Sequence, residues 1–354
     1  MEDNNIIKKI YFVLIFFAII MAGFLCKNLA SVLLPIVFAI FLSSILYPII
    51  KVLKNKTKIP WGISTVILVI AVLIILIALS SLLGSSLTTI ASEYPKYETK
   101  FMSIYKRFAE LFGLNFDEGQ SFINNIWQSL KVREYTQKLA ISLSSGVISF
   151  GKTLFTVFLL LTFLLLEMQF SGEKLNSAFP EKETNKKVKS ITKNILSEIV
   201  HFTSIKAIVS LATGILVYVV LIIFKVDFPI VWAFLAFVMN FIPIFGSVIS
   251  CLLTTLFATI QFFPESLAKP ITIFILMVLI DFSIGNIIEP RIEGKHLGLS
   301  PFVILVSLSI WGYIWGFAGM IFAVPIMVSI KIICENIDYL KPIAVFLGGK
   351  IQKS

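Results

Sequence analysis

Residues 230–263 read IVWAFLAFVMNFIPIFGSVISCLLTTLFATIQFF, an apolar run that is interrupted by four unusual residues, Asn240, Pro243, Gly246 and Ser247. About 20 apolar residues suffice to cross a bilayer, so the run is long enough to form two shorter helices that meet at the break. Proline and glycine disturb backbone hydrogen bonds that lipid cannot replace. The break therefore indicates a special structure inside the membrane. A second long, broken run lies at residues 302–334.

The composition places the chain among polytopic membrane proteins. Of its 354 residues, 58% are hydrophobic and 14% are charged, and the mean hydropathy is +0.96. A soluble core cannot enclose so much apolar surface. The net charge of +10 comes from lysines beside apolar runs, as membrane topology requires, so we expect a lipid bilayer and no nucleic acid as partner. We predict an all-α membrane protein with about eight membrane segments, including the two broken runs.

The first half of the chain predicts four membrane helices and one exported segment. Residues 1–90 hold three apolar runs, and residues 141–170 hold the fourth. Between them, residues 91–140 have mixed charge and apolar residues at helical spacing, which predicts extracytoplasmic helical arms around a turn at residues 113–119. The loop after the second run has four lysines and no acid, so the positive-inside rule places it and the N-terminus in the cytoplasm. These lysines are Lys51, Lys54, Lys56 and Lys58.

The second half predicts a connector, a transport core and a tail. Residues 171–204 are rich in lysine and carry one apolar stripe, which predicts a cytoplasmic amphipathic connector in the headgroup layer. Residues 205–340 form the predicted transport core, a helix followed by a broken hairpin, used twice. Residues 341–354 form the expected cytoplasmic tail.

The two broken runs have matching landmarks. Pro229 and Pro301 begin them, and Gly246 and Gly319 fall one position apart when the prolines are aligned. Each run can cross the membrane once, or it can enter and return as a re-entrant hairpin in an inverted repeat. The basic residues in the loop 289–300 favour the re-entrant alternative, which places this loop inside, although two acids in the loop weaken the preference.

Several polar and glycine residues are candidates for a pathway. Asp281 lies near the middle of its apolar run, where an acid costs about 2.5 to 3.5 kcal/mol. It could contact an ion, a proton or a substrate, or it could accept a structural hydrogen bond. Carbonyls freed near Pro243 could bind a cation or a polar solute, whereas Gly312 and Gly316 favour helix packing. The predicted substrate or ion pathway comprises Asn240, Pro243, Gly246, Ser247, Asp281, Asn286, Gly312 and Gly316. The expected interfacial charge cluster comprises Glu289, Arg291, Glu293 and Lys295.

Motifs for catalysis are absent from the sequence, which has no His-Glu-x-x-His and no Gly-x-Ser-x-Gly. Residues 146–153 (GVISFGKT) have the spacing Gly-x-x-x-x-Gly-Lys-Ser/Thr, but they open the fourth expected membrane helix and do not join a strand to a soluble helix, so we do not read them as a phosphate-binding loop. Three widely spaced cysteines, Cys26, Cys251 and Cys334, predict neither a disulfide nor a metal site. We therefore expect no enzyme and no cofactor, and a gradient as the driving force.

Three stretches carry a family resemblance: residues 240–246 (NFIPIFG), residues 285–301 (GNIIEPRIEGKHLGLSP), and the glycines and proline of residues 311–325. With them, most of the chain resembles the autoinducer-2 exporter family of bacterial membrane proteins. The resemblance implies roughly eight membrane segments, transport without ATP and a homo-oligomer, for which a pentamer is one candidate. It departs at one place: many members resemble Gln-Gln-x-Glu-Gly-Asn where residues 281–286 read DFSIGN. A mechanism that needs the missing glutamate would need Asp281 in its place.

Three functions remain open from the sequence. The leading hypothesis is a gradient-driven transporter in the bacterial inner membrane, with both termini in the cytoplasm, that exports a small polar solute such as an autoinducer-2-like signal. The second is a sodium or lithium/proton antiporter with Asp281 as the carrier, so Na+ or H+ is a candidate partner. The third is a membrane scaffold that acts through the arms at residues 91–140.

Overall fold

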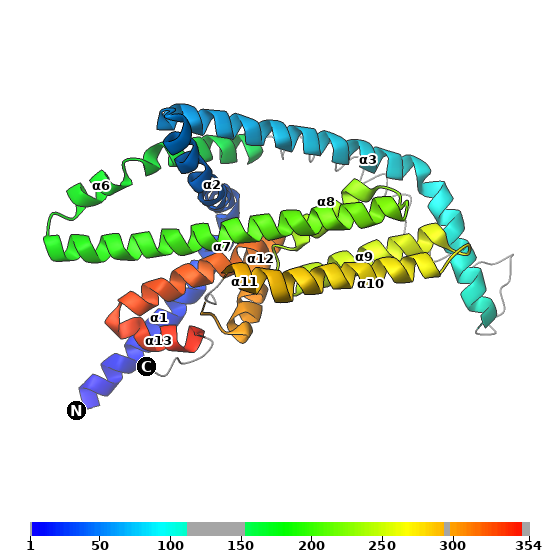
Figure 1. The fold of residues 1–354 in the computed structure, drawn as a ribbon. Coiled ribbons are helices and arrows are strands. Elements are labelled where there is room, and N and C mark those ends of the chain that lie inside the picture. Colours follow the sequence, from blue (N-terminus) through cyan, green and yellow to red (C-terminus); the bar gives the residue numbers. More distant parts are fainter. Residues whose placement is uncertain (1, 112–152, 294–297, 349–354) are drawn as a thin grey trace. The chain divides into compact units, whose positions relative to one another are not determined.

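The computed structural model describes residues 2–111, 153–293 and 298–348, which form helices joined by short connections (Figure 1). No strand occurs within these ranges, although an isolated β-bridge joins Leu299 to Gly348. The predicted all-α membrane fold is confirmed. The expected turn at residues 113–119 and the second arm lie outside the described residues.

Six helices in the described ranges are long and apolar enough to cross a membrane. The number rises to seven if the bent pair Thr153–Met168 and α6 (Ser171–Ala178) forms one span. The six are α2 (Ala30–Thr57), the first part of α3 (Trp61–Ile90), α7 (Lys182–Ile223), α9 (Phe245–Phe262), the segment Ala268–Ile292 and α12 (Pro301–Asn336). Two shorter apolar helices are Val13–Asn28, within α1 (Glu2–Asn28), and α8 (Pro229–Met239).

Two helices are longer than the sequence predicted. α3 (Trp61–Leu111) has 51 residues, so the first expected arm continues the third membrane span without a break, even across Pro95. α7 (Lys182–Ile223) has 42 residues and joins the expected connector to the following span. The domain boundaries expected near residues 90 and 204 therefore fall inside helices. Apolar residues at helical spacing continue through both boundaries, and the only proline at either one leaves the helix intact.

The chain folds into two compact units. Residues 1–69, 154–204 and 295–354 form the first unit, and residues 70–153 and 205–294 form the second. In the second unit, α10 (Ala268–Ser283) continues through a π-helical turn, Ile284–Ile288, into α11 (Glu289–Glu293). α9 and α10 pack side by side there (Figure 1).

Two buried clusters of the second unit set the direction of its helices. Val217 and Leu221 of α7 share one cluster with Ile273 and Met277 of α10. Earlier residues of α7, Ile205 and Val209, share another cluster with Ile284, which follows α10. Because low numbers on α7 pair with high numbers on α10, the two helices run antiparallel.

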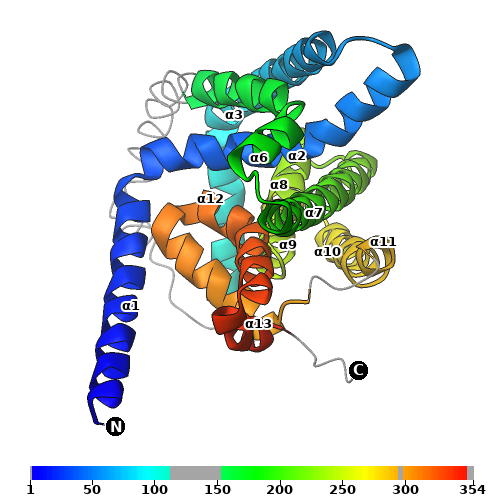
Figure 2. The ribbon, with the colours of Figure 1, turned by 90° about the vertical axis from the view of Figure 1, so that its left-hand side faces the viewer.

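The first unit is built around α12 and the short α13 (Lys341–Leu347), which lie next to each other (Figure 2). Phe322 of α12 is buried and packs its ring against Phe38 and Phe41 of α2, with centroid distances of 4.7 and 5.1 Å. A further cluster joins both ends of α12. It contains Phe202, Leu299, Val303, Ile304, Val324, Val328 and Ile332.

Candidate functional site

The first predicted break is a tight turn between α8 and α9. α8 ends at Met239 and α9 begins at Phe245. Pro243 has no N–H to continue a helix, and its carbonyl accepts a hydrogen bond from Phe245 N at 2.8 Å. Ile244 between them has φ 68° and ψ −59°, the values of a γ-turn that β-branched residues rarely adopt. Such a conformation costs about 1 to 3 kcal/mol, so the turn holds backbone strain.

The helices on either side of this turn form an antiparallel hairpin, which we call hairpin 1 (residues 229–262). At the turn, a Cβ on Gly246 would lie 1.7 Å from the Met239 carbonyl oxygen. Further along, the rings of Trp232 and Phe257 are 4.8 Å apart. Just before α8, Asp227 N donates to Gln261 Oε1 at 2.8 Å. Both ends of the run therefore meet at the end opposite the turn.

The second predicted break reverses the chain in the same way. Gly316, inside α12, has φ 62° and ψ −141°, which L side chains rarely adopt. A Cβ on Gly319 would lie 1.9 Å from the Trp311 carbonyl oxygen. Ser307 Oγ donates to the Ala323 carbonyl at 3.2 Å. α12 is thus two antiparallel arms joined at Gly316, which we call hairpin 2 (residues 301–336).

Each hairpin has its own internal backbone contact, and the two contacts lie at matching positions. Pro229 and Pro301 occupy the first turns of their helices. Met239 and Trp311 each lie ten residues after that proline, and each presents its carbonyl to a glycine beyond the turn. The same close backbone approach therefore closes both breaks.

The second unit brings some predicted pathway residues into one layer, which we call the tip layer. Asn240 Nδ2 donates to Ser210 Oγ of α7 at 3.0 Å. Asp281 of α10 lies at the same level, since its neighbour Ile284 packs on Ile205 and Val209, and Met277 lies further toward the other end of α7. Asp281 is half-buried, and its carboxylate makes no hydrogen bond or ion pair with another described residue.

Other predicted pathway residues lie elsewhere. Ser247 Oγ donates to the Ile244 carbonyl at 3.3 Å, so it caps its own turn. Asn286 is exposed within the π-helical turn. Gly312 and Gly316 belong to hairpin 2, in the other unit, where a Cβ on Gly312 would approach Met320 Cγ at 3.0 Å.

The predicted charge cluster includes a partner that the sequence analysis missed. Glu289 accepts a hydrogen bond from Lys206 Nζ of α7 at 2.6 Å, and the lysine is 6% exposed. Arg291 is exposed, and the Glu293 and Lys295 side chains lie outside the description. A lysine inside an apolar run needs an acidic partner, so the position of Lys206 in the sequence could have predicted a buried ion pair.

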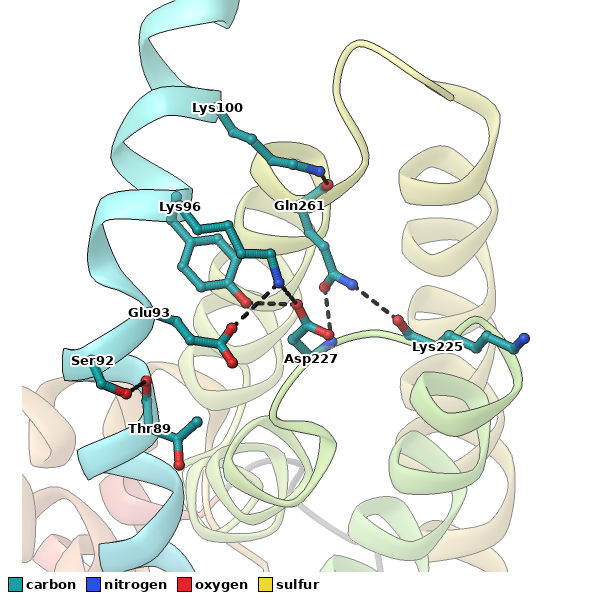
Figure 3. Close-up of polar contacts among 9 residues, drawn as sticks. Thr89, Ser92, Glu93, Lys96, Lys100, Lys225, Asp227 and Gln261 are labelled. Carbon is teal, nitrogen blue, oxygen red and sulfur yellow. Dashed lines mark hydrogen bonds and ion pairs between the residues drawn. The ribbon is translucent and has the colours of Figure 1, made fainter.

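A second polar group that the sequence did not predict lies at the other end of hairpin 1. The extension of α3 packs there, as Figure 3 shows. Tyr97 OH donates to Asp227 Oδ2 at 2.6 Å, and Lys96 Nζ lies 3.3 Å from the same oxygen. Lys100 Nζ donates to the Gln261 carbonyl. Burial, and then the bond to Asp227, raise the pKa of the Tyr97 hydroxyl.

Known proteins resemble this chain over nearly all of its length. A family model described as AI-2E family transporter matches residues 12–338. A putative transport protein of Borreliella burgdorferi is 32% identical over 343 residues, 97% of this chain and 91% of the relative. The AI-2 transport protein TqsA of Escherichia coli is 27% identical over 346 residues, 96% of this chain and 95% of the relative. The putative transport protein YhhT of the same organism is 28% identical over 92% of this chain and 90% of the relative.

The close glycine contacts give the first prediction. Gly246→Ala or Gly319→Ala should lower the free energy of unfolding by about 3 kcal/mol, because the new methyl group forces the hairpin arms apart. Gly84→Ala is the matched control: it meets no atom within 4 Å and should stabilise α3 by about 1 kcal/mol. Thermal unfolding of the purified variants measures both effects. Equal behaviour of the three variants would contradict the hairpin contacts.

The Tyr97 contact gives the second prediction. Tyr97→Phe should lower the free energy of unfolding by about 1.5 kcal/mol, because the hydroxyl donates to a carboxylate. Since the folded-state pKa of Tyr97 is raised, this contribution is complete below its ordinary value of 10.0 and is lost only as pH rises through the folded value. The difference between the two proteins should therefore stay constant from about pH 6 to pH 9. Tyr218→Phe, at an exposed tyrosine of α7, is the control and should change little.

Proposed function

Because the chain belongs to the AI-2E family of transporters, we propose that this membrane transporter exports a small polar solute from the bacterial cell by using a gradient. Members of this family are multi-pass membrane transport proteins and not enzymes. An autoinducer-2-like signal is the proposed solute, since one relative is named an AI-2 transport protein. An ion gradient is the proposed energy source, since the resemblance to this family implies transport without ATP.

The observation that carries the proposal is Asp281 without a partner at the tip layer. An acid in the middle of an apolar span is costly, and such residues usually face a pathway or a partner. No other described residue bonds to the Asp281 carboxylate, while the Asn240 side chain of the same layer already bonds to Ser210. We propose that Asp281 binds the coupling ion or a polar group of the solute. Asn240, Pro243, Gly246 and Ser247 shape the adjoining turn, and Asn286 lies near the next turn of the same helix.

Both broken runs act as re-entrant hairpins in this proposal. The hydrogen bond between Asp227 N and Gln261 Oε1 supports a hairpin 1 that enters and leaves the membrane on one face. Its turn contacts Ser210, which lies 13 residues before the end of α7 at Ile223, about 20 Å along the helix. The turn is therefore deep in a core about 30 Å thick. The antiparallel α7 and α10 each precede a hairpin, as in an inverted repeat.

The proposed orientation places both termini in the cytoplasm of a bacterium, in its inner membrane. The loop with Lys51, Lys54, Lys56 and Lys58 and the basic tail support this by the positive-inside rule. The Asp227 end of the second unit then faces outward and the Glu289 end faces inward. A homo-oligomer remains part of the proposal, on the basis of the resemblance alone.

Sodium or lithium/proton antiport is a second candidate, and the Asp281 carboxylate, which bonds to no other described residue, favours it. A carboxylate without a protein partner can exchange a proton for a metal cation within one conformational cycle. Antiport requires that a sodium gradient alone moves protons. Solute export requires that the solute moves with the gradient.

The third prediction concerns Asp281. In proteoliposomes, Asp281→Asn should reduce gradient-driven solute efflux to the level of empty vesicles, because the neutral amide cannot carry a coupling charge. Glu173→Gln, at an exposed acid of α6, is the matched control and should transport normally. An imposed sodium gradient that acidifies or alkalises the vesicles in the absence of solute would favour antiport. Normal transport by the folded Asp281→Asn variant would contradict the proposed role of Asp281. The scaffold hypothesis makes a different prediction, namely that deletion of residues 91–140 abolishes function.

A further inference from the structure

A buried ion pair lies beside the tip layer. Lys206 Nζ and Glu289 Oε1 are 2.6 Å apart, and their side chains are 7% and 15% exposed. The pair joins α7 to α11, immediately after the π-helical turn Ile284–Ile288. It lies at the end of the second unit opposite Asp227, next to the cluster of Ile205, Val209 and Ile284.

The ion pair lies much nearer to the tip layer than the end of α7 at Ile223 does. Lys206 lies four residues before Ser210, about 6 Å along α7. On the other side, about 20 Å of helix separates Ser210 from Ile223, and the buried cluster around Leu221 and Met277 fills that length. The thin barrier therefore contains the ion pair beside the small cluster of Ile205, Val209 and Ile284, and a larger apolar cluster forms the thick one.

A charged barrier has a property that an apolar one lacks. Burying two charges is expensive, and apolar residues of similar size often hold two helices together as well or better. When such a contact opens, however, water hydrates both charges and recovers much of that cost, so closed and open states can have similar free energies. An ion pair suits a contact that must form and break.

The π-helical turn offers a way to move one partner. Glu289 N bonds to the Ile284 carbonyl across five residues instead of four. A return to α-helical spacing would shift the following residues by one position, a rotation of about 100°. This change alone would turn Glu289 away from Lys206.

We propose that the Lys206–Glu289 ion pair is the gate that closes the tip layer at the α11 end of the second unit. The proposal rests on the proposed transport function. In the closed state the two side chains exclude water from the layer of Asn240 and Asp281. In the open state they separate, and solute passes between α7 and α11.

Thiol labelling tests the gate. A cysteine-free chain, with Cys26, Cys251 and Cys334 changed to alanine, receives the reporter Thr213→Cys, which is 1% exposed and lies one turn from Ser210. An impermeant thiol reagent is added to vesicles from the side on which an Arg291→Cys marker reacts. In the Lys206→Gln, Glu289→Gln variant, the reporter should react about tenfold faster, which corresponds to about 1.4 kcal/mol taken from the closed state.

Two matched variants serve as controls. Lys331→Gln with Glu335→Gln removes an ion pair of 3.3 Å in the other unit and should leave the reaction rate unchanged. Lys206→Glu with Glu289→Lys reverses the charges and keeps the attraction, so the slow reaction should return. An unchanged rate in the folded glutamine variant would overturn the proposal. Fast labelling of the charge-reversed variant would also overturn the proposal. This second variant provides the test if the glutamine variant fails to fold.

The gate and the transport function fail separately. Vesicles that label as expected but move no solute would contradict the transport proposal and leave the gate intact. Vesicles that transport solute, and in which substitution of Lys206 and Glu289 leaves the labelling rate unchanged, would contradict the gate alone.

Discussion

The need to satisfy backbone polar groups away from water governs this structure. A helix that breaks inside a bilayer leaves N–H and C=O groups that lipid cannot hydrogen-bond. The turn of the first break meets this need in part with hydrogen bonds from Ile242 N to the Met239 carbonyl and from Phe245 N to the Pro243 carbonyl. Both breaks also place a glycine close to a carbonyl of the opposite arm, Gly246 by Met239 and Gly319 by Trp311. Only glycine permits so close an approach of two backbones. The hairpins, and everything proposed for their turns, depend on these two contacts.

The second unit has a different kind of polar contact at each end. At one end, Tyr97 and Lys96 of α3 hold Asp227, and Gln261 links the two ends of hairpin 1. At the other end, the buried Lys206–Glu289 pair joins α7 to α11. The tip layer, with Asp281 unpaired among described residues, lies between these contacts and closer to the second. A transporter that alternates its access needs a closure on each side of such a layer.

The sequence predicted those features that depend on local spacing. Pro243 and Gly246 identified the first break, and the alignment of Pro229 with Pro301 predicted that the second corresponds to it. Gly316, which was expected to favour helix packing, is the residue at which α12 leaves the helical conformation. The lengths of α3 and α7 were underestimated, because hydropathy shows where an apolar segment ends and not where a helix ends. The pairs Lys206–Glu289 and Tyr97–Asp227 were missed, since 83 and 130 residues separate their members. At residue 284, where the family resemblance suggested an acid, a buried isoleucine packs on α7, and Asp281 stands one turn before it.

In the proposed topology, both broken runs return to the membrane face from which they enter. Side-specific labelling of single cysteines at Lys225, Glu265 and Arg291 tests it most directly in oriented vesicles, because all three positions are exposed. Re-entrant hairpins predict that cysteines at Lys225 and Glu265 react from the same side and that a cysteine at Arg291 reacts from the opposite side. Reaction of the Lys225 and Glu265 positions from opposite sides would mean that hairpin 1 crosses the membrane, and it would contradict the account.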